Sequence, residues 1–176
     1  NLTVSSNLTS SAQTMKILAI ETSCDETAIA ILECGGALPL PTFKILGNSL
    51  MSQIHIHEKY GGVYPMLAKR EHIKNLPILL DKTVKESGIN VKDVDYVAVT
   101  AGPGLEPALW AGITFAEELG KKFNKPVLPI NHMEGHLFSY LFDATTPLEF
   151  PAVALLVSGG HTELVLVNSF EDYKII

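Results

Sequence analysis

Residues 17–31 read ILAIETSCDETAIAI, and residues 153–167 read VALLVSGGHTELVLV. Each stretch is an apolar run, a polar turn in which a Ser precedes a Thr by four positions, and a second apolar run. Apolar runs of this length around a short polar loop are typical of a β-hairpin. Two such hairpins, about one α/β domain apart, are either a chance likeness or the openings of two copies of a duplicated fold. A second copy would begin near residue 151.

Strands and helices are expected to alternate between the two hairpins. The sequence predicts strands at 43–51, 94–100 and 127–130 and helices at 66–87, 107–123 and 132–140. Gly88 is expected to end the first helix, and Pro77 to bend it or split it in two. Antiparallel strands followed by parallel ones predict the α/β class. We expect residues 15–150 to form one domain and residues 151–176 to open another.

The composition indicates a folded chain rich in apolar residues. Of 176 residues, 47% are hydrophobic and 18% charged, and the mean hydropathy is +0.23. These values exclude disorder by composition. No apolar run approaches the roughly 18 residues of a membrane-spanning helix. The net charge of −6 excludes a chain that binds nucleic acid through a basic surface of its own.

The N-terminus and the cysteines bear on location. Residues 1–14 are mostly Ser, Thr, Asn and small residues, without the basic and apolar regions of a signal peptide, and are expected to form a disordered tail. Cys24 and Cys34 are too few for a disulfide framework. The cytoplasm is therefore the expected compartment.

Two histidines four positions apart form the candidate metal site. On a helix, His132 and His136 share one face, which suits two ligands of one divalent metal ion, although an ordinary helix surface gives the same spacing. Glu134 is expected to point away from the pair, unlike the Glu of the zinc-peptidase motif, which directly follows the first His. His161 is a third-ligand candidate only because it lies in a polar turn.

The other histidines and the glycine-rich turns have plainer interpretations. His55 and His57 are expected on one face of an exposed or edge strand, and His72 is expected to be a surface or cap residue of its helix. The Ser158-Gly159-Gly160 turn either cradles a phosphate or is a simple hairpin turn. The turn at 102–104 either borders an anion-binding crevice or only reverses the chain between a strand and a helix.

Five stretches in order resemble the TsaD family, the tRNA adenosine threonylcarbamoyltransferases formerly labelled O-sialoglycoprotein endopeptidases. They are Ile20–Thr27 (IETSCDET), Tyr60–Val63 (YGGV), Thr100–Leu105 (TAGPGL), Asn131–Leu137 (NHMEGHL) and Ala154–Thr162 (ALLVSGGHT). The resemblance implies the actin-like ATPase fold of sugar kinases, Hsp70 and actin, with the first lobe complete and the second truncated.

The resemblance also implies an activity and its partners. The reaction would transfer threonylcarbamoyl from threonylcarbamoyl-AMP to the exocyclic amine of the adenosine beside the anticodon. The implied partners are tRNA and TsaB-like and TsaE-like proteins, with no membrane involved. The implied cofactor is one divalent metal ion per subunit, iron(II) or zinc.

Site residues follow from the same resemblance. It implies His132 and His136 as metal ligands, and it implies contacts of the adenylate with Leu156, Val157, Ser158, Gly159 and Gly160. The phosphate-side loop would hold Ser23, Asp25 and Glu26.

Two departures from the family pattern affect the expected activity. The family's Pro-Glu-x-Ala-Ser-Arg segment reads Pro65-Met66-Leu67-Ala68-Lys69-Arg70 here. The family's third metal ligand, an Asp of the second lobe, would lie after Ile176, so we expect an N-terminal fragment that is inactive in transfer by itself. The alternatives are a non-catalytic TsaB-like scaffold, which the intact His132–His136 stretch disfavours, and a metal-dependent glycoprotein endopeptidase, which the position of Glu134 disfavours.

Overall fold

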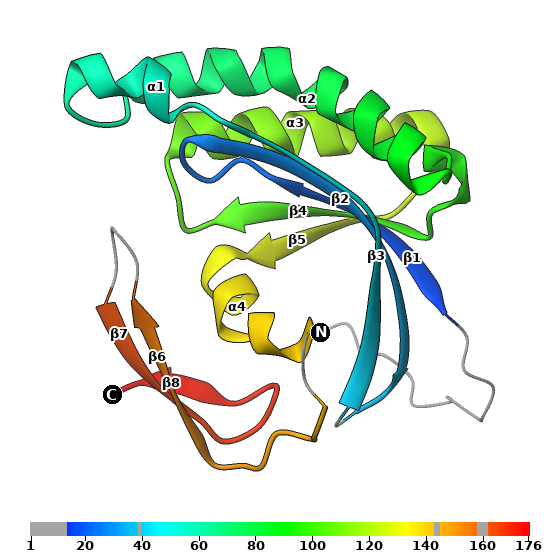
Figure 1. Ribbon diagram of the computed structural model, residues 1–176, viewed down its shortest axis with the longest axis vertical. Coiled ribbons are helices and arrows are strands. Elements are labelled where there is room, and N and C mark those ends of the chain that lie inside the picture. The colour runs from blue at the N-terminus through cyan, green and yellow to red at the C-terminus, as the bar shows by residue number, and fades with distance from the viewer. Residues whose placement is uncertain (1–13, 39, 143–144, 158–161) are drawn as a thin grey trace.

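A five-stranded mixed sheet forms the larger part of the protein. The computed structural model describes residues 14–38, 40–142, 145–157 and 162–176 (Figure 1). The strand order is β3-β2-β1-β4-β5, with β2 antiparallel to its neighbours β1 and β3, and with β4 and β5 parallel to β1. The strands are β1 (Met15–Glu21), β2 (Glu26–Ala37), β3 (Leu40–Ser52), β4 (Tyr96–Gly102) and β5 (Val127–Asn131).

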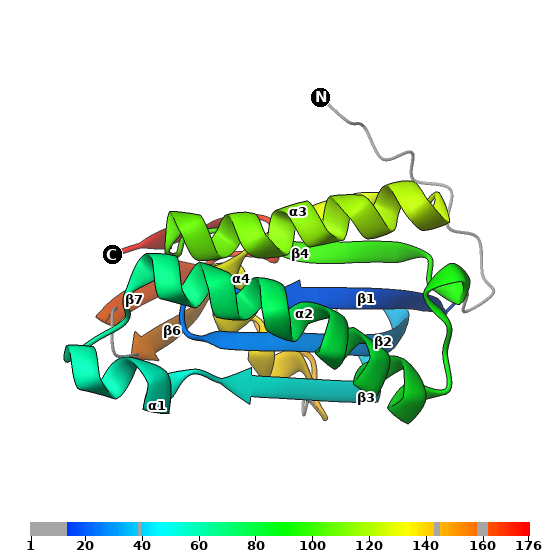
Figure 2. The ribbon, with the colours of Figure 1, turned by 90° about the horizontal axis from the view of Figure 1, so that it is seen from above.

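Two long helices lie side by side on one face of this sheet (Figure 2). They are α2 (Pro65–Ser87) and α3 (Glu106–Phe123). Apolar side chains from β1 and β2 pack with apolar side chains from the helices, and burying this surface is the main force that holds the layers together. Leu18, Ile29, Leu76 and Ala116 are among the buried members of this core.

The end of α2 follows the prediction, whereas one of the two effects expected of the proline in its interior is absent. Gly88 ends the helix in the left-handed conformation, with φ of 68°, which glycine adopts without a steric cost. Pro77 lies inside one uninterrupted helix, so the expected split is wrong. Leu76 and Leu79 are both buried in the core, and their packing holds the helix together across the proline.

The strand expected at His55 and His57 is also wrong. His55 and His57 lie in a short helix, α1 (Ile54–His57), which a 3₁₀ turn at Glu58–Tyr60 follows. His57 is buried and His55 is exposed. A strand would have placed both on one face, whereas the helical turn separates them.

A short helix follows the last strand of the large sheet, and a second, smaller sheet follows that helix. The helix is α4 (His132–Leu137), and a 3₁₀ turn spans Ser139–Phe142. The strands β6 (Ala152–Val157), β7 (Thr162–Val167) and β8 (Tyr173–Ile175) pair antiparallel in the order β6-β7-β8. Both predicted hairpins are present, and β8 adds a strand that the sequence did not predict. The small sheet repeats the β1-β2-β3 meander, as a duplicated fold would.

The small sheet packs against α4 on one face. Leu137 of α4 is buried with Val165 and Val167, and Phe138 and Leu156 pack around them. On the opposite face Val153, Leu155 and Val157 are exposed. Among the described residues, no helix combines the length and apolarity needed to span a membrane.

Candidate functional site

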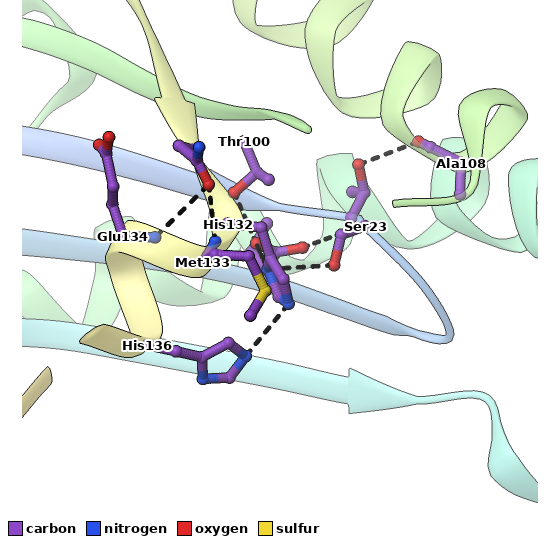
Figure 3. Close-up of polar contacts among 10 residues, drawn as sticks. Ser23, Thr100, Ala108, His132, Met133, Glu134 and His136 are labelled. Atoms are coloured by element: carbon purple, nitrogen blue, oxygen red, sulfur yellow. Dashed lines mark hydrogen bonds and ion pairs between the residues drawn. The ribbon is translucent and has the colours of Figure 1, made fainter. Parts of the chain in front are cut away.

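The candidate site lies where the three parallel strands of the large sheet end. Glu21 is the last residue of β1, Thr100 lies near the end of β4, and His132 directly follows β5. In open α/β sheets the carboxyl ends of the parallel strands form the usual ligand crevice. Figure 3 shows the side chains of Thr100, His132 and Ser23 meeting at this edge.

The Glu21 carboxylate is the centre of the polar cluster. It accepts hydrogen bonds from the Ser23 backbone N–H and from Thr100 Oγ1, the latter at 2.5 Å, and its Oε2 lies 3.2 Å from His132 Nδ1. Burial acts to raise the pKa of Glu21, but the hydrogen bonds from Ser23 and Thr100 and the nearby His132 outweigh burial and leave the pKa below its ordinary value. Glu21 is therefore a carboxylate at neutral pH.

The two histidines of α4 face each other. His132 Nε2 and His136 Nε2 lie 3.1 Å apart, and the rings meet edge to face (Figure 3). The Asn131 side chain caps the helix by accepting from the backbone N–H groups of Met133 at 2.8 Å and Glu134 at 3.4 Å. This cap fixes the first turn of the helix, and the i, i+4 spacing then brings both rings together.

The separation of the two Nε2 atoms fits a shared metal ion. Two imidazole nitrogens at the usual zinc distance of about 2.0–2.1 Å lie about 2.8–3.4 Å apart at right-angled to tetrahedral geometry. Among the residues that the structure describes, no group of three or more His, Cys, Asp and Glu side chains is close enough to complete such a site. Within the described part of the chain, the pair on α4 could therefore supply two positions around such an ion.

Glu134 is directed away from the histidine pair, as expected (Figure 3). Its carboxylate accepts a hydrogen bond from the Tyr173 hydroxyl of β8. This bond, together with burial and the negative charge of Glu134, raises the pKa of Tyr173 to about 12. The contact connects the histidine helix to the small sheet.

The β1–β2 turn brings only part of its predicted loop to the histidines. Ser23 Oγ lies 3.3 Å from His132 Nδ1. Asp25 is half-buried and its carbonyl accepts from the Gln53 backbone N–H at 2.9 Å, while Glu26 is exposed at the start of β2. Among the described contacts of these three residues, Ser23 alone reaches the histidine pair.

The glycine-rich turn after β4 packs directly on Ser23. The Leu105 backbone N–H donates to the Ser23 carbonyl at 2.8 Å. A Cβ atom on Gly104 would lie 2.7 Å from the same carbonyl oxygen, which is closer than real Cβ contacts allow. Glycine at 104 thus allows the turn after β4 to contact the β1–β2 turn. This close contact requires glycine whether or not the crevice binds a ligand.

The predicted adenylate-binding segment is only partly described. Leu156 is half-buried in β6 and packs in the cluster that contains Leu137 of α4, and Val157 is exposed at the end of β6. Ser158, Gly159, Gly160 and the third-ligand candidate His161 lie outside the described residues. The structure therefore places the start of this segment beside the histidine helix.

His72 is neither on the surface nor at an end of α2, so the expected surface or cap position is wrong. It is fully buried between α2 and the β1–β2 turn, with Nδ1 2.8 Å from Thr27 Oγ1 and Nε2 3.0 Å from the Cys24 carbonyl oxygen. Because a carbonyl only accepts, Nε2 carries the proton and donates to it. His72 holds the turn that contains Ser23.

Sequence reasoning missed Glu21 and Thr100 as members of the site. The sequence pattern marks Glu21 only as part of the first hairpin, and Thr100 only as the last residue of a predicted strand. The signal that finds them is topological, since polar residues that end parallel strands gather at one edge of a sheet.

The sheet order, with an antiparallel meander followed by parallel strands and a second meander, is that of an actin-like ATPase fold. Two solved structures of that fold cover this chain almost completely. "YeaZ from Pseudomonas aeruginosa" gives a TM-score of 0.52 at 13% identity, covering 92% of this chain and 66% of that one. The "Aquifex aeolicus PPX-GPPA enzyme" gives 0.51 at 16% identity, covering 93% and 52%. At these identities the likeness shows the fold alone.

The sequence defines the family. The model of the family "TsaD: tRNA N6-adenosine threonylcarbamoyltransferase" matches residues 44–176, and the chain belongs to this family. Curated relatives with the name "tRNA N6-adenosine threonylcarbamoyltransferase" occur in Persephonella marina, 46% identical, and in Aromatoleum aromaticum, 49% identical. Each aligns over 162 residues, 92% of this chain but 44% and 45% of the relatives. The chain thus spans less than half the length of the curated relatives it matches.

Proposed function

We propose that this protein acts in the transfer of threonylcarbamoyl from threonylcarbamoyl-AMP to the exocyclic amine of the adenosine beside the anticodon in tRNA. Family membership supports the reaction class. The observation that carries the proposal is the pair of His132 and His136 Nε2 atoms, 3.1 Å apart at the carboxyl ends of the parallel strands. This chain would supply one wall of the active site.

We propose His132 and His136 as two ligands of one divalent ion, iron(II) or zinc. Imidazole nitrogens suit both metals, and the separation of the two Nε2 atoms fits a shared ion. When bound, the ion would supply Lewis-acid stabilisation of the charge that develops on the carbonyl oxygen during acyl transfer. The residues of this chain would hold and orient the substrate around it.

Two segments border the histidine pair and are proposed to bind the adenylate. Leu156 and Val157 end β6, which lies beside α4. On the other side, Ser23 Oγ lies next to His132. We propose that the segments 156–160 and 23–26, with Asp25 and Glu26 at the outer end of the second, hold the adenylate between them.

A metallopeptidase is a poorer fit to this geometry. The general base of the zinc-peptidase motif is a Glu that approaches the metal-bound water. Glu134 instead points away from the histidines and accepts a hydrogen bond from Tyr173. A glycoprotein-cleavage assay of the metal-loaded protein is expected to show no cleavage, and cleavage that depends on His132 would support the peptidase.

Binding of tRNA is proposed to depend on surface from outside this chain. The chain carries 13 Lys and Arg against 19 Asp and Glu, so it lacks the positive charge that phosphate contacts require. TsaB-like and TsaE-like proteins are the proposed partners. Free Cys24 and Cys34 are consistent with the cytoplasm as the proposed location.

A chimera tests the proposed activity. The aligned segment of the Aromatoleum aromaticum relative is replaced by this chain, and threonylcarbamoyladenosine is measured in tRNA after incubation with threonylcarbamoyl-AMP and the relative's partner proteins. We expect modified tRNA from the chimera and at least a hundredfold loss for His132→Ala and His136→Ala. The matched control His55→Ala, an exposed histidine of α1, is expected to retain activity. Equal activity of all three variants would refute the site.

A further inference from the structure

We propose that Glu21 is the positioning residue of the histidine pair, holding His132 in the tautomer that directs an unprotonated Nε2 toward the metal position. This inference rests on the proposed metal site. The Glu21 carboxylate contacts His132 through Nδ1, the ring nitrogen that faces away from His136, at 3.2 Å. Glu21 would act through His132 and would not itself touch the substrate.

The tautomer follows from the chemistry of the partners. A carboxylate has only acceptors, so the proton of a neutral His132 ring must reside on Nδ1 and be donated to Glu21. Nε2 then keeps its lone pair, which is the form that binds a metal ion. Carboxylates that accept a hydrogen bond from the other ring nitrogen act in this way on many metal-bound histidines, and losing one costs about 10–100-fold in metal affinity.

The surroundings of Glu21 hold its carboxylate in place. Oε1 accepts from the Ser23 backbone N–H, and Oε2 accepts from Thr100 Oγ1 at 2.5 Å as well as facing His132. These donors come from the β1–β2 turn, from β4 and from the residue after β5. One side chain therefore fixes His132 relative to all three parallel strands.

Only a carboxylate satisfies these donors from both oxygens. A Gln at this position would turn its NH₂ group either toward the Ser23 N–H or toward Thr100 and His132. In the first case two donors face each other. In the second case the NH₂ group favours an unprotonated Nδ1, which moves the ring proton to Nε2 and blocks metal binding. Because Gln has nearly the same size as Glu, Glu21→Gln tests the hydrogen bonding of the carboxylate without changing the packing.

The test measures the His132 tautomer and the zinc affinity separately. In the metal-free protein, ¹⁵N NMR of the imidazole nitrogens is expected to show a protonated Nδ1 in the unmodified chain and to lose that preference in Glu21→Gln. Zinc affinity, measured by competition with a chromophoric chelator, is expected to fall about 10–100-fold in Glu21→Gln. Circular dichroism melting shows that each variant is folded.

Two further variants make the result specific. Glu33→Gln removes a carboxylate on β2 that contacts Thr14 and Lys16, and should change neither measurement. Thr100→Val removes one hydrogen-bond donor to Glu21. It is expected to lower the zinc affinity by less than Glu21→Gln does. If Glu21→Gln does not fold, Thr100→Val provides the test.

The outcomes separate this inference from the proposed function. An unchanged His132 tautomer or an unchanged zinc affinity in a folded Glu21→Gln would overturn the positioning role. Equal zinc affinity of the unmodified chain and of the His132→Ala, His136→Ala double variant would refute the metal site itself.

Discussion

His72 connects α2 to the turn that carries Ser23. The ring is fully buried, accepts at Nδ1 from Thr27 Oγ1 and donates from Nε2 to the Cys24 carbonyl. Burial lowers the pKa of His72, and the favourable interactions of the charged ring with the Cys24 carbonyl, Glu21 and Asp25 do not offset it. The turn is therefore held by a neutral histidine.

The first prediction concerns the pH dependence of folding. Because the folded-state pKa of His72 is below its ordinary value of 6.5, the unfolded chain binds a proton more readily. The His72 contribution to the free energy of unfolding is fully present above pH 6.5 and is lost as the pH falls from there through the folded-state pKa. Urea unfolding between pH 7.5 and pH 5 should show this loss, and His72→Gln should remove part of the slope. His55→Gln, at an exposed position, should leave the slope unchanged, and equal slopes for all three proteins would contradict the prediction.

At the scale of elements, α3 approaches the residue that follows β1 so closely that only glycine fits at one position. A Cβ atom on Gly112 would lie 2.4 Å from Thr22 Oγ1. Thr22 is fully buried and donates to the Ala108 carbonyl of α3 at 3.0 Å, so it cannot move aside without losing that bond. This contact sets the distance between helix and sheet just behind the candidate site.

The second prediction reverses the usual effect of alanine in a helix. Gly→Ala inside a helix ordinarily stabilises by about 0.5–1 kcal/mol. Gly112→Ala should instead destabilise by about 1–3 kcal/mol, because the added methyl overpacks against Thr22. Gly135→Ala in α4 is the control, since a Cβ there meets nothing within 4 Å. Chemical denaturation measures both variants, and stabilisation by Gly112→Ala would show that the close approach is absent.

The third prediction concerns the contact between α4 and β8. The Tyr173 hydroxyl donates to the Glu134 carboxylate, and both side chains are half-buried. A double-mutant cycle with Tyr173→Phe and Glu134→Gln at pH 8 should give a coupling of about 1 kcal/mol in the free energy of unfolding. A matched cycle that pairs Tyr173→Phe with Glu163→Gln on β7 should give a coupling near zero. Strictly additive effects of the first pair would mean that the contact contributes nothing.

The sequence predicts the elements better than it predicts how they meet. The apolar runs of β1, β2, β6 and β7 and the helical spacing in α2 give the correct element types, because each pattern is local. The burial of His72 and the meeting of Glu21 with His132 depend on strand order, which no local pattern contains. The strand β8 is three residues long, too short for a periodic signal. The loop role predicted for Ser158, Gly159 and Gly160 stays a prediction.

At the scale of the whole molecule, metal binding should raise the stability of the folded chain. A ligand that binds only the folded state stabilises it by about 2.7 kcal/mol at a hundredfold excess over its Kd. For a chain of this size, that corresponds to a rise in Tm of about 5–10 °C. Thermal melts of the chelator-treated protein, with and without added zinc, measure the shift.

Histidine variants test whether this stabilisation arises at the α4 pair. His132→Ala and His136→Ala should each abolish most of the rise in Tm, while His55→Ala should keep it. If zinc raises the Tm of the double variant as much as that of the unmodified protein, the stabilising ion is bound elsewhere.

The helix α4 is hydrogen-bonded to both sheets. Its first turn is capped by Asn131, the last residue of the large sheet, and its Glu134 accepts from Tyr173 of the small sheet. A six-residue helix is too short to deform much along its length. A change in the angle between the sheets must therefore rotate the helix or break one of these two hydrogen bonds. Rotation of the helix would alter the alignment of the His132 ring with Glu21. The proposed affinity of the histidine pair for an ion should therefore depend on the angle between the two sheets.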